Sequence, residues 1–332
     1  MSRPVRPARP VPIARAVRPA LVVLLALAAL FGLAGPAATG AAPAHAAPFT
    51  LVDQTGRTLA LAEAPRRIVS LVPSVSETLF ALGAEDRLVG VTDFCDFPPA
   101  ARAKPRVGGM VAPSLEAIAA LRPDVVVVTP AGNSDETFAQ LARLRLPTFA
   151  VNPIGVGQVI DLIARLGALA ERPAAAAELA ATLSRRIRVV TARVAGLPRP
   201  RVLYVVWPEP LIVPGRGSIV SELIDLAGGE SVTADGGAGY PRYSVEAALA
   251  RNPEVIVLAR HGNQNEAIGR EPWERFTGLP AIRKGRLHAV NGDVLHRYGP
   301  RVVDGLEELA RLFHPAGRAA ASTPPATGVG PR

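Results

Sequence analysis

Apolar residues recur at steps of three and four along one stretch of the chain, residues 173–196. The positions on this apolar face are Leu179, Leu183, Ile187, Val190 and Val194. Pro173 suits the first position of a helix, and Gly196, which two prolines follow closely, suits its end. The pattern predicts a single helix over 173–196, roughly 36 Å long at 1.5 Å per residue. A helix of that length can span a domain or join two domains.

Two segments with similar sequences lie on either side of this helix. The segment that starts at Ser114 is SLEAIAALRPDVVVVTPAGN, and the one that starts at Ser244 is SVEAALARNPEVIVLARHGN. A weaker match pairs Glu77 with Glu222, each preceded by a serine and followed by leucines and a glycine. Self-similarity over a long range is typical of a duplicated unit. The sequence therefore predicts two similar lobes joined by one helix.

Strand-like and helix-like segments alternate in both halves of the chain. We expect a hairpin over residues 49–61, then strands near 67–71, 88–91, 124–129, 148–151, 201–206, 255–259 and 287–290. The expected helices are 74–82, 114–121, 136–144, 157–170, 219–227, 244–251 and 300–313. In the first helix, Ser74 and Glu77 have the spacing of a capping box. The alternation predicts an α/β fold with a mostly parallel sheet in each lobe and helices on both faces.

The two ends of the chain differ in composition from its body. An arginine-rich start, an apolar run over 20–33 and Ala-His-Ala at 44–46 are the pattern of a cleaved secretory signal peptide. An uncleaved membrane anchor is the alternative for this segment. The predicted organisation is a signal peptide (1–46), an N-terminal α/β lobe (47–172), a linker helix (173–196), a C-terminal α/β lobe (197–314) and a flexible tail (315–332).

The formal net charge of +9 arises mainly from the ends. Without the seven arginines there, the net charge is about +2. No basic stripe interleaved with aromatic residues occurs, which argues against a nucleic-acid partner. Cys95 is the single cysteine, so an intrachain disulfide cannot form.

Motifs for catalysis or metal binding are missing from the sequence. It contains neither a Gly-x-Ser-x-Gly elbow nor a Gly-x-x-x-x-Gly-Lys phosphate loop. The aspartates and histidines lack the tight spacing of a metal site. We therefore predict no catalytic residue, no metal site and no cofactor. An exported α/β enzyme that uses Asp and His groups is the less favoured alternative.

Aromatic residues gather at expected strand ends and loops: Phe94, Phe97, Trp207, Tyr240 and Tyr243. Such side chains suit a large planar or apolar ligand, and a hydrophobic plug under the loops is the alternative. Asp293 and Arg297 are four residues apart, as in a helical ion pair. If they lie in a loop instead, they would address polar groups of a ligand.

Glu116 and Glu246 occupy the same position of the repeated segment, two residues after a serine expected to cap a helix. A carboxylate there offsets the helix dipole by roughly 0.3–1 kcal/mol, which explains each glutamate alone. The alternative is that two equivalent acids, one per lobe, dock on a symmetric basic partner.

Four segments together resemble a known family: RIVSLVPSVSETLFALG, VGVTDFCDFPP, SLEAIAALRPDVVVV and YPRYSVEAALARNPEVIVL. They are similar to the periplasmic substrate-binding proteins of ABC importers for cobalamin and ferric siderophores, most closely to the cobalamin-binding members. The resemblance covers about residues 65–314. It implies two Rossmann-like lobes with parallel sheets, joined by a single long and rather stiff helix, with the ligand between the lobes. It also implies that Glu116 and Glu246 meet arginines of the permease in the inner membrane.

The resemblance also implies ligand-binding roles for Phe94, Tyr240, Asp293 and Arg297. With the loop aromatics Phe97 and Trp207, and with Met110, they make up the predicted ligand-binding set. Met110 and Thr129 stand where the family has two tryptophans. From the duplicated lobes, the linker helix, the signal peptide and the family motifs together, we expect a monomeric, non-catalytic periplasmic receptor that delivers cobalamin to an ABC permease. The same receptor for haem or a ferric siderophore is the alternative, with Arg297 pairing a ligand carboxylate.

Overall fold

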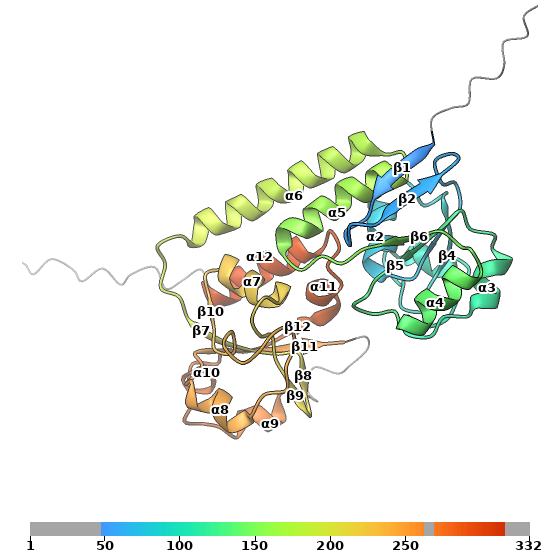
Figure 1. Cartoon of the computed structure of the whole chain (residues 1–332). Helices are drawn as coiled ribbons and strands as arrows, with labels where there is room; N and C mark the ends of the chain where they lie inside the picture. The colour runs from blue at the N-terminus through green and yellow to red at the C-terminus, as the bar shows by residue number, and fades with distance from the viewer. Residues whose placement is uncertain (1–47, 262–268, 316–332) are drawn as a thin grey trace, which may run out of the picture. The chain divides into compact units, whose positions relative to one another are not determined.

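A computed structural model describes residues 48–261 and 269–315 of the chain (Figure 1). The predicted signal peptide and almost all of the predicted tail lie outside these residues. Within the two described ranges, no helix combines the length and the apolar character that a membrane crossing requires.

Two four-stranded parallel sheets form the centres of two lobes. The N-terminal sheet contains β3 (Ile68–Ser70), β4 (Leu88–Val91), β5 (Val125–Val128) and β6 (Thr148–Ala150) in the order β4-β3-β5-β6. The C-terminal sheet contains β7 (Arg201–Val205), β10 (Glu230–Ser231), β11 (Val255–Arg260) and β12 (Leu287–Asn291) in the order β10-β7-β11-β12. In both sheets, the strand that comes second along the chain lies at one edge, next to the first, and the third and fourth follow on the other side. The two lobes therefore share one topology. This confirms the predicted α/β fold and its duplication.

Helices follow the strands in a corresponding order in both lobes. The N-terminal lobe contains α2 (Pro73–Ala81), η1 (Pro99–Ala103), α3 (Leu115–Ala120), α4 (Asp135–Arg143) and α5 (Val156–Leu169). The C-terminal lobe contains α7 (Ile219–Leu226), α8 (Val245–Ala250), α9 (Glu271–Glu274), α10 (Pro280–Arg283), α11 (Gly292–His296) and α12 (Val302–Phe313). Two antiparallel hairpins complete the fold, β1 (Phe49–Val52) with β2 (Thr58–Leu61), and β8 (Trp207–Pro208) with β9 (Leu211–Ile212).

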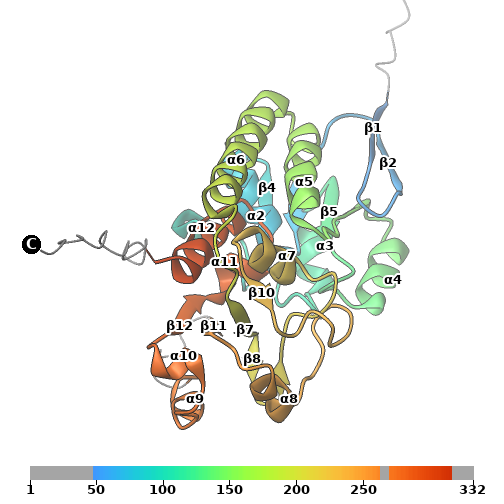
Figure 2. The same cartoon turned by 90° about the vertical axis from the view of Figure 1, so that its left-hand side faces the viewer.

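The strands are buried on both faces, as expected of parallel sheets covered by helices. In β5, Val125 and Val127 point into one apolar core, while Val126 and Val128 point into another with α3 and α4. β11 alternates in the same way. Figures 1 and 2 show α8, α9 and α10 on one side of the C-terminal sheet and α7 and α12 on the other.

The long helix α6 (Pro173–Val194) confirms the helix predicted from the apolar spacing. Leu183, Val190 and Val194 are buried, and Gly196, at φ +76°, follows the helix end. Both views show α6 alongside α5 (Figures 1 and 2). On α6, Arg186 forms ion pairs with Asp304 and Glu307 of α12 at 2.6 and 2.9 Å. The helix thus contacts elements of both lobes.

One apolar core runs through both lobes. It takes buried side chains from α2 and α5 of the N-terminal lobe, from α7 and α12 of the C-terminal lobe, and from α6. The outer faces of the two sheets have separate cores. The inner faces of the two sheets therefore share a single apolar interior.

The predicted capping box at the start of α2 is wrong. The N-cap residue is Val72, Pro73 occupies the first turn, and no side chain caps the helix. Pro73 lacks an N–H and has its φ preset, so it starts the helix before Ser74 can act as a cap. Glu77 is buried instead and contacts a distant residue. The short elements η1, β8, β9, β10, α9, α10 and α11 were also not predicted, because two to five residues show no clear periodicity.

A close approach of α5 to the start of α6 gives a stability prediction. A Cβ at Gly167 would lie 2.2 Å from the Cβ of Ala176 and 3.1 Å from the carbonyl oxygen of Arg172. Gly167→Ala should therefore lower the free energy of unfolding by about 1–3 kcal/mol, as overpacking does. Gly157→Ala in the same helix is the control, since a Cβ there meets nothing within 4 Å. Urea unfolding measures both variants, and equal stabilities would contradict the close packing.

Candidate functional site

The predicted ligand-binding residues lie beyond the carboxyl ends of strands from both sheets. This is the edge at which ligands bind in open parallel sheets. Phe94, Phe97 and Met110 come from segments that follow β4, and Trp207 follows β7. Asp293 and Arg297 follow β12, and Tyr240 lies in the segment between β10 and α8.

The loop after β4 is anchored by the thiol of Cys95, which is buried. The hydroxyl of Ser76 donates to Cys95 Sγ at 3.2 Å, and Thr92 Oγ1 lies 3.2 Å from the same sulfur. Because the thiol points inward, the neighbouring rings remain at the surface. Phe94 is 55% exposed and Phe97 is 38% exposed. Phe94 thus has the free apolar area that a ligand can cover.

Arg297 joins two acids, one from each lobe. Its guanidinium lies 2.9 Å from Asp293 on α11 and 2.5 Å from Asp96 of the N-terminal lobe. The helical ion pair is therefore confirmed, and the loop placement of the two residues is wrong, because α11 forms there. Burial raises the pKa of Asp96, but the hydrogen bond and charge of Arg297 outweigh it and hold that pKa below its ordinary value. The three side chains Asp96, Asp293 and Arg297 together carry more negative than positive charge.

A second arginine lies against a predicted ligand-binding ring. The guanidinium of Arg301 lies 3.7 Å from the ring centre of Phe97. The same guanidinium lies 2.7 Å from the carboxylate of Glu77, whose side chain is only 4% exposed. One face of Phe97 is therefore covered by a cation of the protein itself.

The C-terminal lobe gathers a cluster of rings at its strand ends. The members are Tyr204, Trp207, Tyr240, His261, His296 and Tyr298. The ring centres of Trp207 and His261 are 6.1 Å apart, and those of His261 and His296 are 5.1 Å apart. Tyr240 lies 6.3 Å from His296 and its hydroxyl bonds that of Tyr298. Two histidines thus connect the predicted residues Trp207 and Tyr240.

His296 is held in its neutral form. Burial, together with the nearby His261, lowers the pKa of His296 to about 3. Its Nε2 lies 3.1 Å from the hydroxyl oxygen of Tyr204. Among the described residues, no group of three or more His, Cys, Asp or Glu side chains is arranged to hold a metal ion.

Met110 is positioned by a buried amide. Asn133 donates from Nδ2 to the carbonyl oxygen of Met110 at 2.7 Å, and its Oδ1 accepts from the backbone N–H of Thr129 at 2.7 Å. The methyl of Met110 would lie 2.6 Å from a Cβ at Gly132, so it packs over this glycine. Asn133 therefore holds Met110, from the segment after β4, against the turn that begins at Thr129 after β5.

Glu116 and Glu246 lie in the first turns of the equivalent helices α3 and α8, and both are exposed. The preceding serines cap these helices by accepting from backbone N–H groups at 3.2 and 3.1 Å, as predicted. Ser244 also donates to Glu246 at 2.7 Å, which lowers the pKa of that glutamate. Glu116 and Glu246 therefore occupy equivalent positions in the two lobes.

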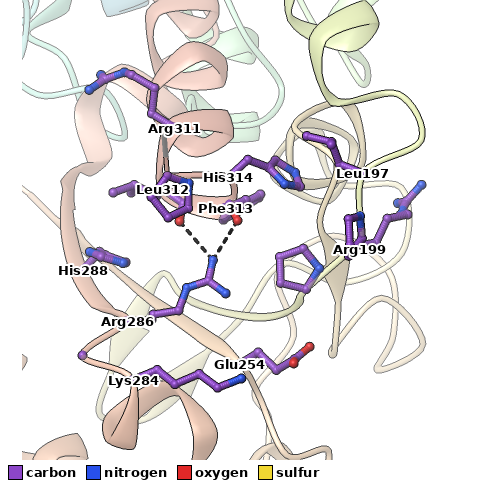
Figure 3. Close-up of a pocket in the computed structure, with 14 residues that line it drawn as sticks. Leu197, Arg199, Glu254, Lys284, Arg286, His288, Arg311, Leu312, Phe313 and His314 are labelled. Carbon is purple, nitrogen blue, oxygen red and sulfur yellow. Dashed lines mark hydrogen bonds between the residues drawn. The ribbon is translucent and has the colours of Figure 1, made fainter. Parts of the chain in front are cut away.

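A cavity of about 800 Å³ lies elsewhere, at the amino ends of the C-terminal strands. Its lining includes the basic side chains of Arg199, Lys284, Arg286 and Arg311, the acid Glu254, and His288 and His314. Figure 3 shows Arg286 directed at the end of α12, where it donates to the carbonyl oxygens of Leu312 and Phe313 at 3.1 and 2.8 Å. None of the predicted ligand-binding residues lines this cavity, and Arg286 there caps a helix.

Two lobes of one parallel topology, with exposed aromatic residues beyond their strand ends, define a two-lobed α/β binding protein. The chain belongs to the periplasmic binding protein family, whose profile matches residues 68–293. It is 30% identical over 243 residues to the vitamin B12-binding protein of Vibrio cholerae serotype O1, covering 73% of this chain and 87% of that protein.

Solved structures show the same relationship. The periplasmic vitamin B12-binding protein of Vibrio cholerae has a TM-score of 0.68 at 28% identity, covering 75% of this chain and 97% of that one. A periplasmic haem-binding protein from Pseudomonas aeruginosa has a TM-score of 0.69 at 28% identity, covering 76% and 94%. The fold is therefore shared by proteins named for two different ligands.

Several residues of the site were not predicted: Glu77, Asp96, His261, His296 and Arg301. For Glu77 a signal existed, since it matches Glu222 in the weaker repeat, but a capping box was assigned to it. The others acquire their roles through partners far away in the sequence. The spacing of nearby residues therefore carried no sign of them.

The low pKa of His296 predicts a pH dependence. This histidine stays neutral in the folded state, whereas in the unfolded state it takes up a proton near the ordinary pKa of 6.5. The free energy of unfolding therefore falls as the pH drops from 6.5 toward about 3. The loss is about 1.4 kcal/mol per pH unit, hence about 2 kcal/mol at pH 5. His296→Gln retains a polar group beside Tyr204 without titrating, so it should reduce this loss. Urea unfolding between pH 7 and 5 measures it, and a ring that titrates near 6.5 by NMR would contradict the prediction.

Proposed function

We propose that the protein is a periplasmic substrate-binding protein that captures cobalamin and delivers it to an ABC importer in the inner membrane. Family membership supports the receptor class, and relatives named vitamin B12-binding proteins support the ligand. The proposal includes export by the signal peptide at residues 1–46, lobes at 47–172 and 197–314, and a monomeric, non-catalytic protein.

The ligand lies, in this proposal, between the loops at the strand ends of the two lobes. Phe94 from one lobe, and Trp207 and Tyr240 from the other, are 55%, 42% and 37% exposed. Covering each ring with a ligand removes apolar area from water, worth about 25 cal/mol per Å². Met110, smaller than a tryptophan, adds an adaptable apolar contact.

The paired state of Arg297 is the observation that favours cobalamin over haem. A haem propionate or a chelate carboxylate needs a cation, and Arg297 was the predicted one. Two carboxylates, Asp96 and Asp293, already bind its guanidinium. An incoming carboxylate would have to compete with both. The corrin ring carries neutral amide side chains, whose N–H groups can donate to these same carboxylates.

Haem remains a second candidate because a haem-binding protein shares the fold equally well, with a TM-score of 0.69. The histidines His261 and His296 at the same strand ends are suitable neighbours for an iron porphyrin. A pair of titrations separates the two ligands.

Calorimetric titration of the mature chain with cyanocobalamin should give saturable one-to-one binding. Haem should bind more weakly, because Arg297 is neutralised by its two acids. Phe94→Ala should weaken the binding of cyanocobalamin by roughly ten- to a hundredfold, because about 1.5–3 kcal/mol of apolar burial is lost. Leu144→Ala, another exposed apolar position, is the matched control. Tight binding of haem without heat from cyanocobalamin would overturn the ligand assignment.

Delivery is proposed to use Glu116 and Glu246 as contacts for basic residues of the permease. Their exposure and equivalent register in the two lobes support this role. The double variant Glu116→Arg with Glu246→Arg should abolish uptake in cells and leave ligand affinity unchanged. Like charges facing one another at a docking surface cost several kcal/mol.

The control for this variant is Glu136→Arg with Glu178→Arg, which reverses two other exposed acids. It should support normal uptake. Loss of ligand affinity in the first double variant, or loss of uptake in both, would count against docking through these glutamates.

A further inference from the structure

Two buried or half-buried glutamates reach from one lobe to the start of a helix in the other. Glu77 on α2 accepts from the backbone N–H of Arg301, just before α12, at 3.3 Å. Its other oxygen accepts from the Arg301 side chain at 2.9 Å. Glu222 on α7 accepts from the backbone N–H of Val156, the first residue of α5, at 2.8 Å. Each lobe thus provides a carboxylate to the last helix of the other lobe.

The two contacts are equivalent in the duplicated fold. α2 and α7 follow the first strand of their sheets, and α5 and α12 are the last helices of their lobes. A glycine lies against each carboxylate: a Cβ at Gly155 would be 3.1 Å from Glu222, and one at Gly299 would be 3.1 Å from Glu77. The absence of a side chain at these positions allows the close approach. This correspondence explains the weaker of the two sequence repeats.

Neither helix has a cap of its own. The N-cap residues Gly155 and Arg301 make no side-chain capping bond. The first N–H groups of a helix have no partner within the helix, and a carboxylate there also interacts favourably with the helix dipole. Separation of the lobes would leave these N–H groups without their caps. It would also remove the Arg301 cation from the Glu77 carboxylate, which is only 4% exposed when the lobes are packed together.

We propose that Glu77 and Glu222 are positioning residues that set the orientation of the two lobes and thereby the spacing of the ligand-binding loops. The link to the loops is direct, because the Arg301 that Glu77 binds also lies against Phe97. Nearby, Arg297 bonds Asp96 across the same pair of lobes. The effect on the ligand rests on the proposed function, whereas the effect on lobe orientation does not.

Spin labels on α4 and α8 measure lobe orientation in the ligand-free protein. Ala139→Cys and Ala250→Cys are exposed sites outside the ligand-binding set, and the native Cys95 is buried. Glu222→Ala should broaden the distance distribution between the labels. Glu222→Gln retains a carbonyl acceptor for Val156 N–H, so it should restore the wild-type distribution. Glu178→Ala on the exposed side of α6 is the control and should change nothing.

Glu77→Ala should broaden the distribution further, since it also removes an ion pair. If this variant fails to fold, the Glu222 series alone decides the proposal. An unchanged distribution in folded Glu222→Ala would overturn it, and so would a broadening of the same size in Glu222→Gln.

Binding of cyanocobalamin is the second measurement. If loss of a cap reduces the binding-competent orientation to about one molecule in ten, the apparent affinity falls about tenfold. Unchanged affinity despite a broadened distribution would overturn the link between lobe orientation and the ligand. If the wild-type protein itself binds no cyanocobalamin, the ligand assignment fails, and the label distances still decide the role of the glutamates.

Discussion

A single apolar core shared by the two lobes is the constraint on which the rest of the structure depends. Side chains from α2, α5, α6, α7 and α12 meet in it, so neither inner sheet face is covered by its own lobe alone. Burial of one large aliphatic side chain is worth about 1.5–3 kcal/mol, and many such side chains contribute here. Opening the lobes would expose part of this surface. The separation of the strand-end loops that are proposed to bind the ligand is therefore a consequence of core packing.

Polar contacts between the two lobes have a defined geometry that the apolar core does not supply. Apolar burial is non-directional, whereas a carboxylate at a helix start requires one distance and one angle. Glu77 and Glu222 make such contacts between the lobes, and Arg297 forms an ion pair across them. They lie near the strand ends, where the orientation of the lobes sets the spacing of the loops proposed to bind the ligand. The core thus holds the lobes together, and the charged groups select their arrangement.

The duplication extends from topology to chemistry. Equivalent positions of the two lobes hold a serine cap followed by an exposed glutamate, in α3 and in α8. Glu77 and Glu222 form a second equivalent pair with an internal role. A repeated carboxylate can therefore face either inward to the other lobe or outward to a partner. Burial and the presence of a partner distinguish the two kinds.

Local patterns in the sequence determined the helix α6, the buried strands β5 and β11, and the two-lobe architecture. Periodicity, β-branched runs and serine caps act over a few residues, so one sequence is enough to identify them. Where two local signals competed, at Pro73 and Ser74, the assignment of the cap was wrong.

The tertiary structure alone decided which charged side chains of the site are paired. Arg297 binds Asp96, which is 201 residues away in the sequence, and Arg301 binds Glu77, which is 224 residues away. Which charges meet depends on which segments fold side by side, and no short-range spacing records that. The sequence by itself determined the elements, the repeat and the aromatic residues offered to a ligand. The fold decided which cations remain available to that ligand, because neutralisation of a charge depends on the three-dimensional position of its partner.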